Sequence, residues 1–366
     1  MNIACIAATR SFHHRQIGGT DAFFRRIARK LAGSGHRVTF MYYPAAEPRR
    51  ATQPTGIDVC YYESFEQMLR ALDNFDGSVL INAIRASDRL QWIHFRHRHR
   101  KRLRFFMVYS LFPDTAYGRL RHFLETRLYP CNGGCICISG RIANYLGERR
   151  RRARALLPPV PHEYFRRPTE KSLTGSIVVA YIGRLELGKG AMEAIDILEH
   201  LCRREDIDAR VHAYAFDGDE GAEPLRERLS KNNRITCHET VHQGWSPHVE
   251  QQMAEVLRDI DVLLLPYRRV SSSIDTPLLL LEGMASLCCC ITRGGGDIPE
   301  VYGESPFLIA GRGHDEFVAE ACDVITGGRR SMIAKERERL VQRRNALKFD
   351  VSTAADRLIR ILEEQQ

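Results

Sequence analysis

Short apolar runs alternate with segments of helical periodicity along the first half of the chain. Residues 2–8 form one such run, and from Phe23 to Leu31 the apolar side chains recur at the spacing of a helix. Thr20 is the expected N-terminal cap of this helix, and Gly33 and Gly35 predict its end. Further strands are expected at 37–43, 79–81, 104–109 and 135–138. Strands that alternate with helices in this way predict a parallel, doubly wound sheet.

The same alternation starts again after a stretch rich in proline. Four prolines between 158 and 168 interrupt the periodicity, and a new strand is predicted at 177–182. Later strands are expected at 209–216, 262–265 and 288–292, with helices that start near Gly190, Val249 and Pro277. We therefore predict an α/β protein of two Rossmann-like domains, residues 1–165 and 166–345, whose doubly wound parallel sheets face each other across a cleft. Residues 346–366 are expected to form a C-terminal helix that packs back toward the first domain through its apolar face.

Composition and charge narrow the class of protein. Of the 366 residues, 44% are hydrophobic and 27% are charged, which is typical of a globular protein rather than of a disordered one. No apolar run reaches about 18 residues and no basic leader is present, so we expect a cytoplasmic protein that does not span a membrane. The eleven cysteines show none of the spacings of a zinc site, and we expect reduced thiols, no metal and no cofactor. The formal net charge of +9 indicates an anionic partner of some kind.

Two cations follow the first strand of the second domain. This strand ends in Gly183–Arg184, and Lys189–Gly190 leads directly into a helix. Helix N-termini attract anions through backbone N–H groups and the helix dipole, while arginine supplies a bidentate fork and lysine a point charge. We therefore expect Arg184 and Lys189 to hold a diphosphate, the alternative being a solvated pair of surface cations.

A second helix N-terminus is predicted at Thr276–Pro277, with threonine as the cap and proline at the first helical position. Ser273, Asp275 and Thr276 precede or begin this helix, and hydroxyls and backbone N–H groups of this segment are expected to contact phosphate. Glu282, in the second turn, is expected to accept hydrogen bonds from the vicinal hydroxyls of a ribose. The alternative is a glutamate on an ordinary exposed helix face.

The ordered set of these motifs resembles the retaining GT-B glycosyltransferases (glycosyl transferases group 1, family 4-like) over nearly the full chain. It comprises Gly18–Gly19, Gly183–Arg184 with Lys189–Gly190, Asp261 to Pro266, Leu281 to Ala285, and Gly295 to Glu300. The resemblance implies that Gly18 and Gly19 let the backbone approach the donor diphosphate, and that Arg184 and Lys189 neutralise it. It also implies that Glu282 binds ribose, so Arg184, Lys189 and Glu282 are the candidate catalytic residues.

The chain departs from the family pattern at two positions. The first glutamate of the family's Glu-x7-Glu motif falls on Ile274, with Asp275 next to it. Many members also carry a cleft histidine after a strand of the first domain, whereas here 104–109 continues into Ser110 to Asp114, so no general base is assigned. By resemblance the reaction retains the anomeric configuration and needs no divalent metal, because the cations stabilise the leaving diphosphate.

A basic segment, residues 85–104, contains seven arginines, Arg85 and Arg104 included, and one lysine, together with Trp92, Ile93 and Phe95. An amphipathic basic segment of this kind is typical of contact with an anionic membrane surface. A solvated helix face is the alternative, and nucleic acid is disfavoured because no recognition motif accompanies the charge. We expect attachment to the inner face of a membrane and an acceptor that is lipid-linked or a lipopolysaccharide-like glycan.

These patterns together predict transfer of a sugar from a nucleotide-diphosphate sugar, a UDP-sugar being favoured, to a glycan, lipid-linked or small-molecule acceptor. One alternative is a hydrolase or epimerase of the same fold, which would use the same diphosphate site. The other is a non-catalytic binding subunit, suggested by Ile274 and by the missing histidine.

Overall fold

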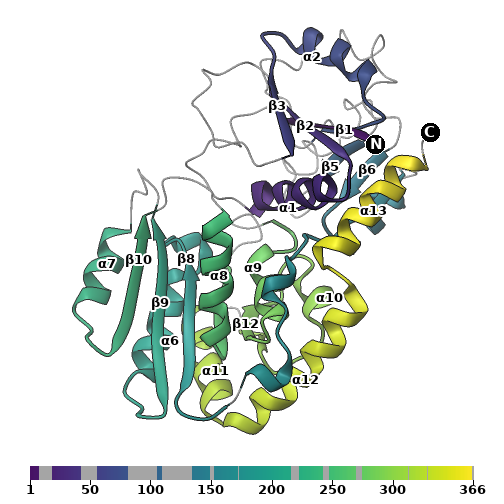
Figure 1. Cartoon of the computed structure of the whole chain (residues 1–366). Helices are drawn as coiled ribbons and strands as arrows, with labels where there is room; N and C mark the ends of the chain where they lie inside the picture. Colours follow the sequence, from purple (N-terminus) through teal and green to yellow (C-terminus); the bar gives the residue numbers. More distant parts are fainter. Residues whose placement is uncertain are drawn as a thin grey trace. The chain divides into compact units, whose positions relative to one another are not determined.

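The computed structural model of the chain is shown in Figure 1. It describes residues 1–7, 19–42, 56–80, 105–108, 134–148, 152–171, 173–215, 222–241, 247–268, 274–311, 313–327 and 329–364. The chain divides into two compact units, Met1–Pro159 together with Asp350–Gln366, and Val160–Phe349. The domain boundaries predicted from the sequence, 165/166 and 345/346, differ from the observed ones, 159/160 and 349/350, by a few residues. Val160 and Phe349 are the first and last residues of the second unit, and the backbone N–H of Val160 donates to the carbonyl oxygen of Phe349 at 2.9 Å.

The first unit contains a seven-stranded parallel sheet in the order β3-β2-β1-β4-β5-β6-β7. Its strands are β1 (Asn2–Ala7), β2 (Arg37–Tyr42), β3 (Ile57–Tyr61), β4 (Gly77–Leu80), β5 (Phe105–Val108), β6 (Gly134–Cys137) and β7 (Ala153–Ala155). Ile3, Ala4 and Ile6 of β1 are completely buried. Side chains that point to opposite faces are thus both covered, as in parallel sheets with helices on both sides.

Four α-helices of the first unit lie within the described residues: α1 (Gly19–Gly33), α2 (Phe65–Ala71), α5 (Gly140–Gly147) and α13 (Val351–Glu363). Helix α1 begins one residue before Thr20, so the expected cap lies inside the first turn. The apolar face of α13 is buried and packs against α1 and β4. Helices α1 and α13 lie side by side in Figure 1. The last helix therefore completes the first unit, and Asp350 caps it by accepting a hydrogen bond from the N–H of Thr353 at 2.9 Å.

The second unit contains a six-stranded parallel sheet in the order β10-β9-β8-β11-β12-β13. Its strands are β8 (Ile177–Gly183), β9 (Ile207–Ala215), β10 (Ile235–Val241), β11 (Val262–Leu265), β12 (Cys289–Arg293) and β13 (Leu308–Ile309). The central strand β11 is buried along its whole length. Because every pair is parallel, the carboxyl ends of all these strands lie at one edge of the sheet.

The α-helices of the second unit are α6 (Ala191–Leu201), α7 (Glu223–Ser230), α8 (Pro247–Asp259), α9 (Leu278–Ala285), α10 (Ile298–Tyr302), α11 (His314–Gly327) and α12 (Arg329–Leu347). Short 3-10 turns at His162–Tyr164, Pro168–Glu170 and Leu187–Lys189 complete the described elements of the second unit. Helix α9 is apolar on nearly all sides and is almost entirely buried. No helix in the described ranges is both long enough and apolar enough to cross a bilayer.

A charged cluster is buried at the amino ends of β8 and β11. Arg337 pairs with Oδ1 of Asp261, whose other oxygen accepts from the N–H of Val178 at 2.9 Å. Beside it, the ammonium group of Lys171 donates to the carbonyl oxygens of Ile260 and, at 3.0 Å, of Ser286. These contacts link the amino ends of β8 and β11 to α8, α9 and α12. The predicted fold class, two Rossmann-like units with parallel sheets, is confirmed.

Candidate functional site

The first predicted cation, Arg184, follows the carboxyl end of β8. Its guanidinium pairs with Oε1 of Glu186 at 2.6 Å, and about a third of each side chain is exposed. The hydroxyl of Tyr181 donates to the carbonyl oxygen of Arg184 at 2.6 Å. Burial raises the pKa of Tyr181, which keeps this hydroxyl protonated as a donor. The backbone that carries Arg184 is therefore fixed while its head group remains accessible.

The second cation, Lys189, lies in a tight turn just before α6. The 3-10 turn Leu187–Lys189 ends at Gly190, which has φ +81° and stands immediately before the first residue of α6. A Cβ on Gly190 would lie 2.0 Å from the carbonyl oxygen of Pro266, so only glycine fits. This close approach holds the turn against the chain that leaves β11. The structure thus places Arg184, Lys189 and the N-terminus of α6 along the same edge of the sheet.

The expected cap at Thr276 is wrong. Pro277 occupies the N-cap position with ψ 129°, and α9 begins at Leu278. Thr276 is completely buried, and its hydroxyl donates to Oδ2 of Asp297 at 3.2 Å. The hydroxyl therefore links this loop to the one after β12 and does not cap α9. The N–H of Asp297 also donates to the carbonyl oxygen of Asp275 at 3.2 Å, which joins the same two loops.

The two predicted acidic residues of this region are buried and lie at the strand ends. Asp275 is 1% exposed and Glu282 5% exposed. Burial raises the pKa of Tyr214, and the charge of Glu282 adds to the effect. Burial also raises the pKa of Tyr267, followed by the charges of Cys290 and Glu282. For both tyrosines Glu282 is among the contributing charges, so its carboxylate lies near the end of β9 and near the residue that follows Pro266. Glu282 is thus not the exposed helix-face residue of the alternative reading.

Several predicted residues fall outside the described ranges. These are Gly18, Ser273 and the whole basic segment at 85–104. Gly19 is the first residue of α1 in the first unit. The predictions for these positions stay predictions.

A cavity of about 520 Å³ opens at the carboxyl ends of β11, β12 and β13. The residues that line it are Tyr267, Arg268, Ile274, Asp275, Pro277, Arg293, Gly294, Gly295, Ile298, Leu308, Ile309, Ala310 and Gly311. Most of this wall is apolar, and Arg268, Arg293 and Asp275 supply its charges. Among the residues predicted from the sequence as site residues, Asp275 is the one that lines the cavity within the described part of the chain.

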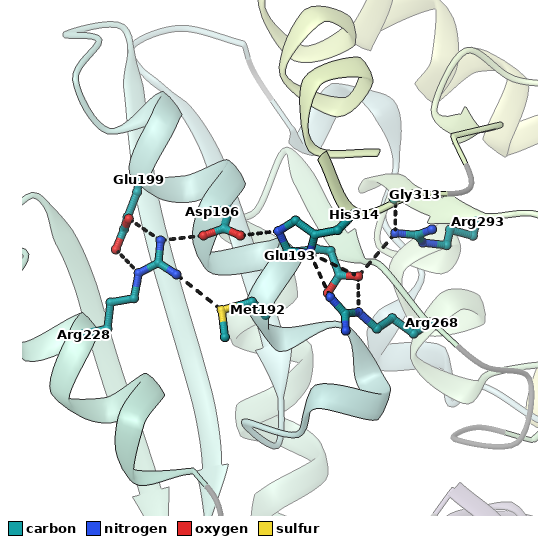
Figure 2. Close-up of polar contacts among 9 residues, drawn as sticks. All are labelled: Met192, Glu193, Asp196, Glu199, Arg228, Arg268, Arg293, Gly313 and His314. Carbon is teal, nitrogen blue, oxygen red and sulfur yellow. Dashed lines mark hydrogen bonds and ion pairs between the residues drawn. The ribbon is translucent and has the colours of Figure 1, made fainter. Parts of the chain in front are cut away.

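Both arginines of the cavity wall are held by Glu193, whose side chain is completely buried in the first turn of α6 (Figure 2). Arg268 contacts Oε1 through its Nε, and Arg293 reaches the same oxygen at 3.3 Å. Arg293 also donates to the carbonyl oxygens of Gly311 at 3.2 Å and Gly313 at 3.4 Å. Its guanidinium lies 4.2 Å from the centre of the Phe317 ring. Arg293 is therefore fixed on several sides, while Arg268, with 39% of its side chain exposed, is the more accessible guanidinium.

The network extends along α6 away from the cavity. Nε2 of His314 lies 2.5 Å from Oδ2 of Asp196, and Nδ1 lies 2.8 Å from Nη2 of Arg268. Arg228 pairs with both Asp196 and Glu199 at 2.5 Å. Hydrogen bonding to Glu199 and Asp196 raises the pKa of Arg228 against the opposing effect of burial. Figure 2 shows these groups as one continuous chain of contacts from Arg293 to Glu199.

Sequence reasoning missed this network. Its acidic members, Glu193, Asp196 and Glu199, are spaced three residues apart on α6, so they share one helix face. This spacing, directly after the Lys189–Gly190 turn, was a usable signal. Their partners, Arg228, Arg268, Arg293 and His314, come from four separate segments, and this pairing could not be deduced from the sequence. In the described part of the chain, no group of His, Cys, Asp and Glu is arranged to hold a metal ion.

Residues 176–327 match the family model described as "Glycosyl transferases group 1". The matched segment contains the turn with Lys189, the loop with Asp275, and α9 with Glu282. No curated protein is similar to the chain in sequence.

Solved structures of similar fold cover both units. HepE from Anabaena in complex with UDP has a TM-score of 0.70 at 13% identity, and the match covers 100% of each chain. Sucrose-phosphate synthase from Thermosynechococcus elongatus has a TM-score of 0.67 at 13% identity, covering 99% of this chain and 98% of the other. WaaG, a glycosyltransferase involved in lipopolysaccharide biosynthesis, has a TM-score of 0.63 at 14% identity over 99% of both. At these identities the likeness establishes the fold, so this chain is an α/β protein of the GT-B fold whose residues 176–327 match group 1 glycosyltransferases.

Proposed function

We propose that the chain is a glycosyltransferase that takes a sugar from a nucleoside-diphosphate sugar and transfers it to a glycan, lipid-linked or small-molecule acceptor. The observation that carries the proposal is the group 1 match over 176–327, the segment in which Arg184 and Lys189 stand at the N-terminus of α6. A uridine donor is favoured because HepE structures contain UDP and UDP-glucose.

In the proposed reaction the diphosphate lies at the end of β8. The N–H groups of the first turn of α6 and the dipole of that helix favour an anion there. Lys189 adds a point charge, and Arg184 exchanges Glu186 for a phosphate oxygen. These positive groups stabilise the charge that develops on the leaving diphosphate when the glycosidic bond breaks. Retention of the anomeric configuration and transfer without a divalent metal are parts of the same proposal.

The acidic residues contact the neutral parts of the donor. Glu282 is buried near Tyr214 and Tyr267, and its carboxylate is proposed to accept hydrogen bonds from the ribose hydroxyls. Asp275 on the cavity wall is proposed to accept from hydroxyls of the donor sugar. Ser273 is proposed to donate to a phosphate oxygen, and the Gly18–Gly19 backbone to approach the diphosphate. Thr276 has a supporting role, because its hydroxyl holds Asp297.

The basic segment at 85–104 is proposed to hold the protein at an anionic membrane surface on the cytoplasmic side. Sedimentation with vesicles of phosphatidylcholine alone, and with added phosphatidylserine or phosphatidylglycerol, tests this proposal. We expect binding to the anionic vesicles that decreases as salt rises. Equal sedimentation with neutral and anionic vesicles would remove the support for a membrane role.

Thermal unfolding with UDP, GDP and ADP tests the donor site. A ligand at a hundredfold excess over its Kd stabilises the folded state by about 2.7 kcal/mol. We expect one nucleotide to raise the Tm of the wild type and to have no effect on the double variant Arg184→Ala, Lys189→Ala. The matched control is Arg204→Ala, Lys231→Ala, which removes an exposed arginine and an exposed lysine from the same unit, each in a surface ion pair. It should respond as the wild type does.

Product analysis separates the proposed transferase from its alternatives. Sugar transfer that depends on an acceptor supports the proposal. Release of free sugar or formation of an epimer in the absence of acceptor would favour a hydrolase or epimerase. Tight nucleotide binding with no turnover of any donor would favour a binding subunit.

A further inference from the structure

The cavity at the ends of β11, β12 and β13 combines three kinds of surface: two guanidinium groups, one carboxylate and a largely apolar remainder. We propose that it binds a sugar bearing a carboxylate, so that the donor is a nucleoside-diphosphate hexuronic acid. The inference rests on the proposed function, since it concerns the sugar attached to the diphosphate.

The position of the cavity suits a group that continues from the diphosphate. The turn with Lys189 and Gly190 packs against the carbonyl oxygen of Pro266. Tyr267, the next residue along the chain, lines the cavity. A donor whose diphosphate occupies the N-terminus of α6 therefore has its next group directed along this wall.

The two arginines of the wall favour an anionic group on one part of the ligand. Arg268 and Arg293 share a single buried partner, Glu193, so the two guanidiniums and this carboxylate carry one net positive charge between them. Arg293 contacts Gly311, Gly313 and Glu193. Burial lowers its pKa against the opposing charge of Glu193, and the charge of Arg268 adds to the lowering. A carboxylate contact from the ligand relieves the repulsion between the two cations. Arg268, the more exposed of the two, makes that contact.

Glu193 positions the side chains of Arg268 and Arg293. Its Oε1 receives both arginines, whereas Oε2 has no hydrogen-bond partner among the described residues. A buried carboxylate that is satisfied through one oxygen costs stability. The arrangement is therefore explained by what it does to Arg268 and Arg293, namely to hold both guanidiniums at the cavity wall.

The rest of the wall matches the rest of a hexuronic acid. Asp275 supplies an acceptor for the sugar hydroxyls, and the backbone of Gly294 and Gly295 leaves room for the ring. Pro277, Ile298 and Ile309 make the surroundings apolar, which strengthens an ion pair relative to the same pair in water. A hydrogen bond to a charged group contributes about 1.5–3 kcal/mol, so the uronic acid should bind about 10- to 100-fold more tightly than the neutral hexose.

Calorimetric titration of the full chain tests this preference. The uronic acid donors UDP-glucuronate, UDP-galacturonate and GDP-mannuronate are compared with UDP-glucose, UDP-galactose and GDP-mannose, and with UDP and GDP alone. We expect one uronic acid donor to bind at least tenfold more tightly than its neutral counterpart. In Arg268→Gln the preference should fall below threefold while the affinity for the free nucleotide is unchanged, and Arg268→Lys should keep part of the preference.

The matched control is Arg228→Gln. Arg228 belongs to the same network through Asp196 but does not line the cavity, so this variant should keep the full preference. Equal binding of uronic acid and neutral donors, with the nucleotide still bound, would overturn the inference and leave the proposed function intact. Binding of none of these nucleotides and donors would overturn the proposed function, and the inference with it.

Discussion

The Cα atom of Gly190 faces the carbonyl oxygen of Pro266 so closely that a Cβ would lie 2.0 Å from that oxygen. Gly190 also has φ +81°, which side chains rarely adopt. Gly190→Ala should therefore both strain the backbone and move the turn that carries Lys189. We expect a loss of at least about 1–3 kcal/mol in unfolding free energy and loss of nucleotide binding. Urea unfolding and UDP titration measure the two effects.

Gly33→Ala is the control for this substitution. Gly33 ends α1, and a Cβ there would have no atom within 4 Å. This variant should be within about 1 kcal/mol of the wild type. Nucleotide binding by Gly190→Ala at wild-type affinity would contradict the role given to the turn.

We expect Glu186 to compete with the proposed diphosphate for Arg184. The two side chains pair at 2.6 Å, and a carboxylate next to the proposed diphosphate site also repels it. Glu186→Gln should bind UDP more tightly, by about two- to fivefold at low salt, because a partly exposed ion pair contributes up to about 1 kcal/mol. Titration at two ionic strengths measures the effect, which should shrink as salt rises. Weaker binding by Glu186→Gln would mean that Glu186 positions Arg184 instead.

The buried pair of Arg337 and Asp261 should be costly to break. Both side chains are at least nine-tenths buried, and Asp261 also accepts from the N–H of Val178. Arg337→Met leaves that carboxylate buried without its cation, and we expect a loss of about 3–5 kcal/mol. The exposed pair of Arg204 and Asp206 is the comparison, and Arg204→Ala should cost at most about 1 kcal/mol. Chemical denaturation of both variants distinguishes the two kinds of pair.

The stacked rings of His212 and His238, on neighbouring strands, predict a pH effect on stability. Burial, then the charges of His238 and Arg210, lowers the pKa of His212 to about 4, against an opposing effect of Asp259. Above pH 6.5 the imidazole is neutral in both states. Between pH 6.5 and about 4 the unfolded chain binds a proton that the folded chain does not, so the free energy of unfolding falls as pH decreases.

At about 1.4 kcal/mol per pKa unit, discounted for a partly exposed ring, the expected loss is about 1–2 kcal/mol. His212→Phe keeps an aromatic ring and should remove this part of the pH dependence. His200→Gln, at an exposed position of α6, should leave the dependence unchanged. Unfolding curves at pH 7, 5.5 and 4 make the comparison, and an identical slope in His212→Phe and wild type would contradict the assignment.

The elements with strong apolar patterns could be predicted from the sequence. Strand β11 and helix α13 were found because one is continuously apolar and the other has a clear apolar face. Strand β10 was missed because Thr236 to Thr240 are all exposed, which leaves no alternation to detect. Helix α12 was missed because few of its residues are apolar, with Ile333 and Leu340 among its buried ones.

The candidate site was predictable where its residues are neighbours in the sequence. Arg184 and Lys189 follow one strand and precede one helix, so local patterns identify them. The role of Glu193 was not predictable, because it depends on Arg268 and Arg293, which approach it only when strands β8, β11 and β12 are placed side by side. The capping prediction for Thr276 failed for the same reason, since its hydroxyl contacts Asp297 in another loop.

The hydrogen bond between Val160 and Phe349 brings together the two points at which the chain enters and leaves the second unit. The second unit is therefore an insertion whose two ends adjoin, and the sheet of the first unit is complete without it. Two cuts, at Pro159 and at Asp350, would exchange this insertion for its counterpart from another protein of the same fold without dividing any strand of the first unit's sheet. Under the proposed function, donor choice and acceptor choice would thus recombine as separate modules.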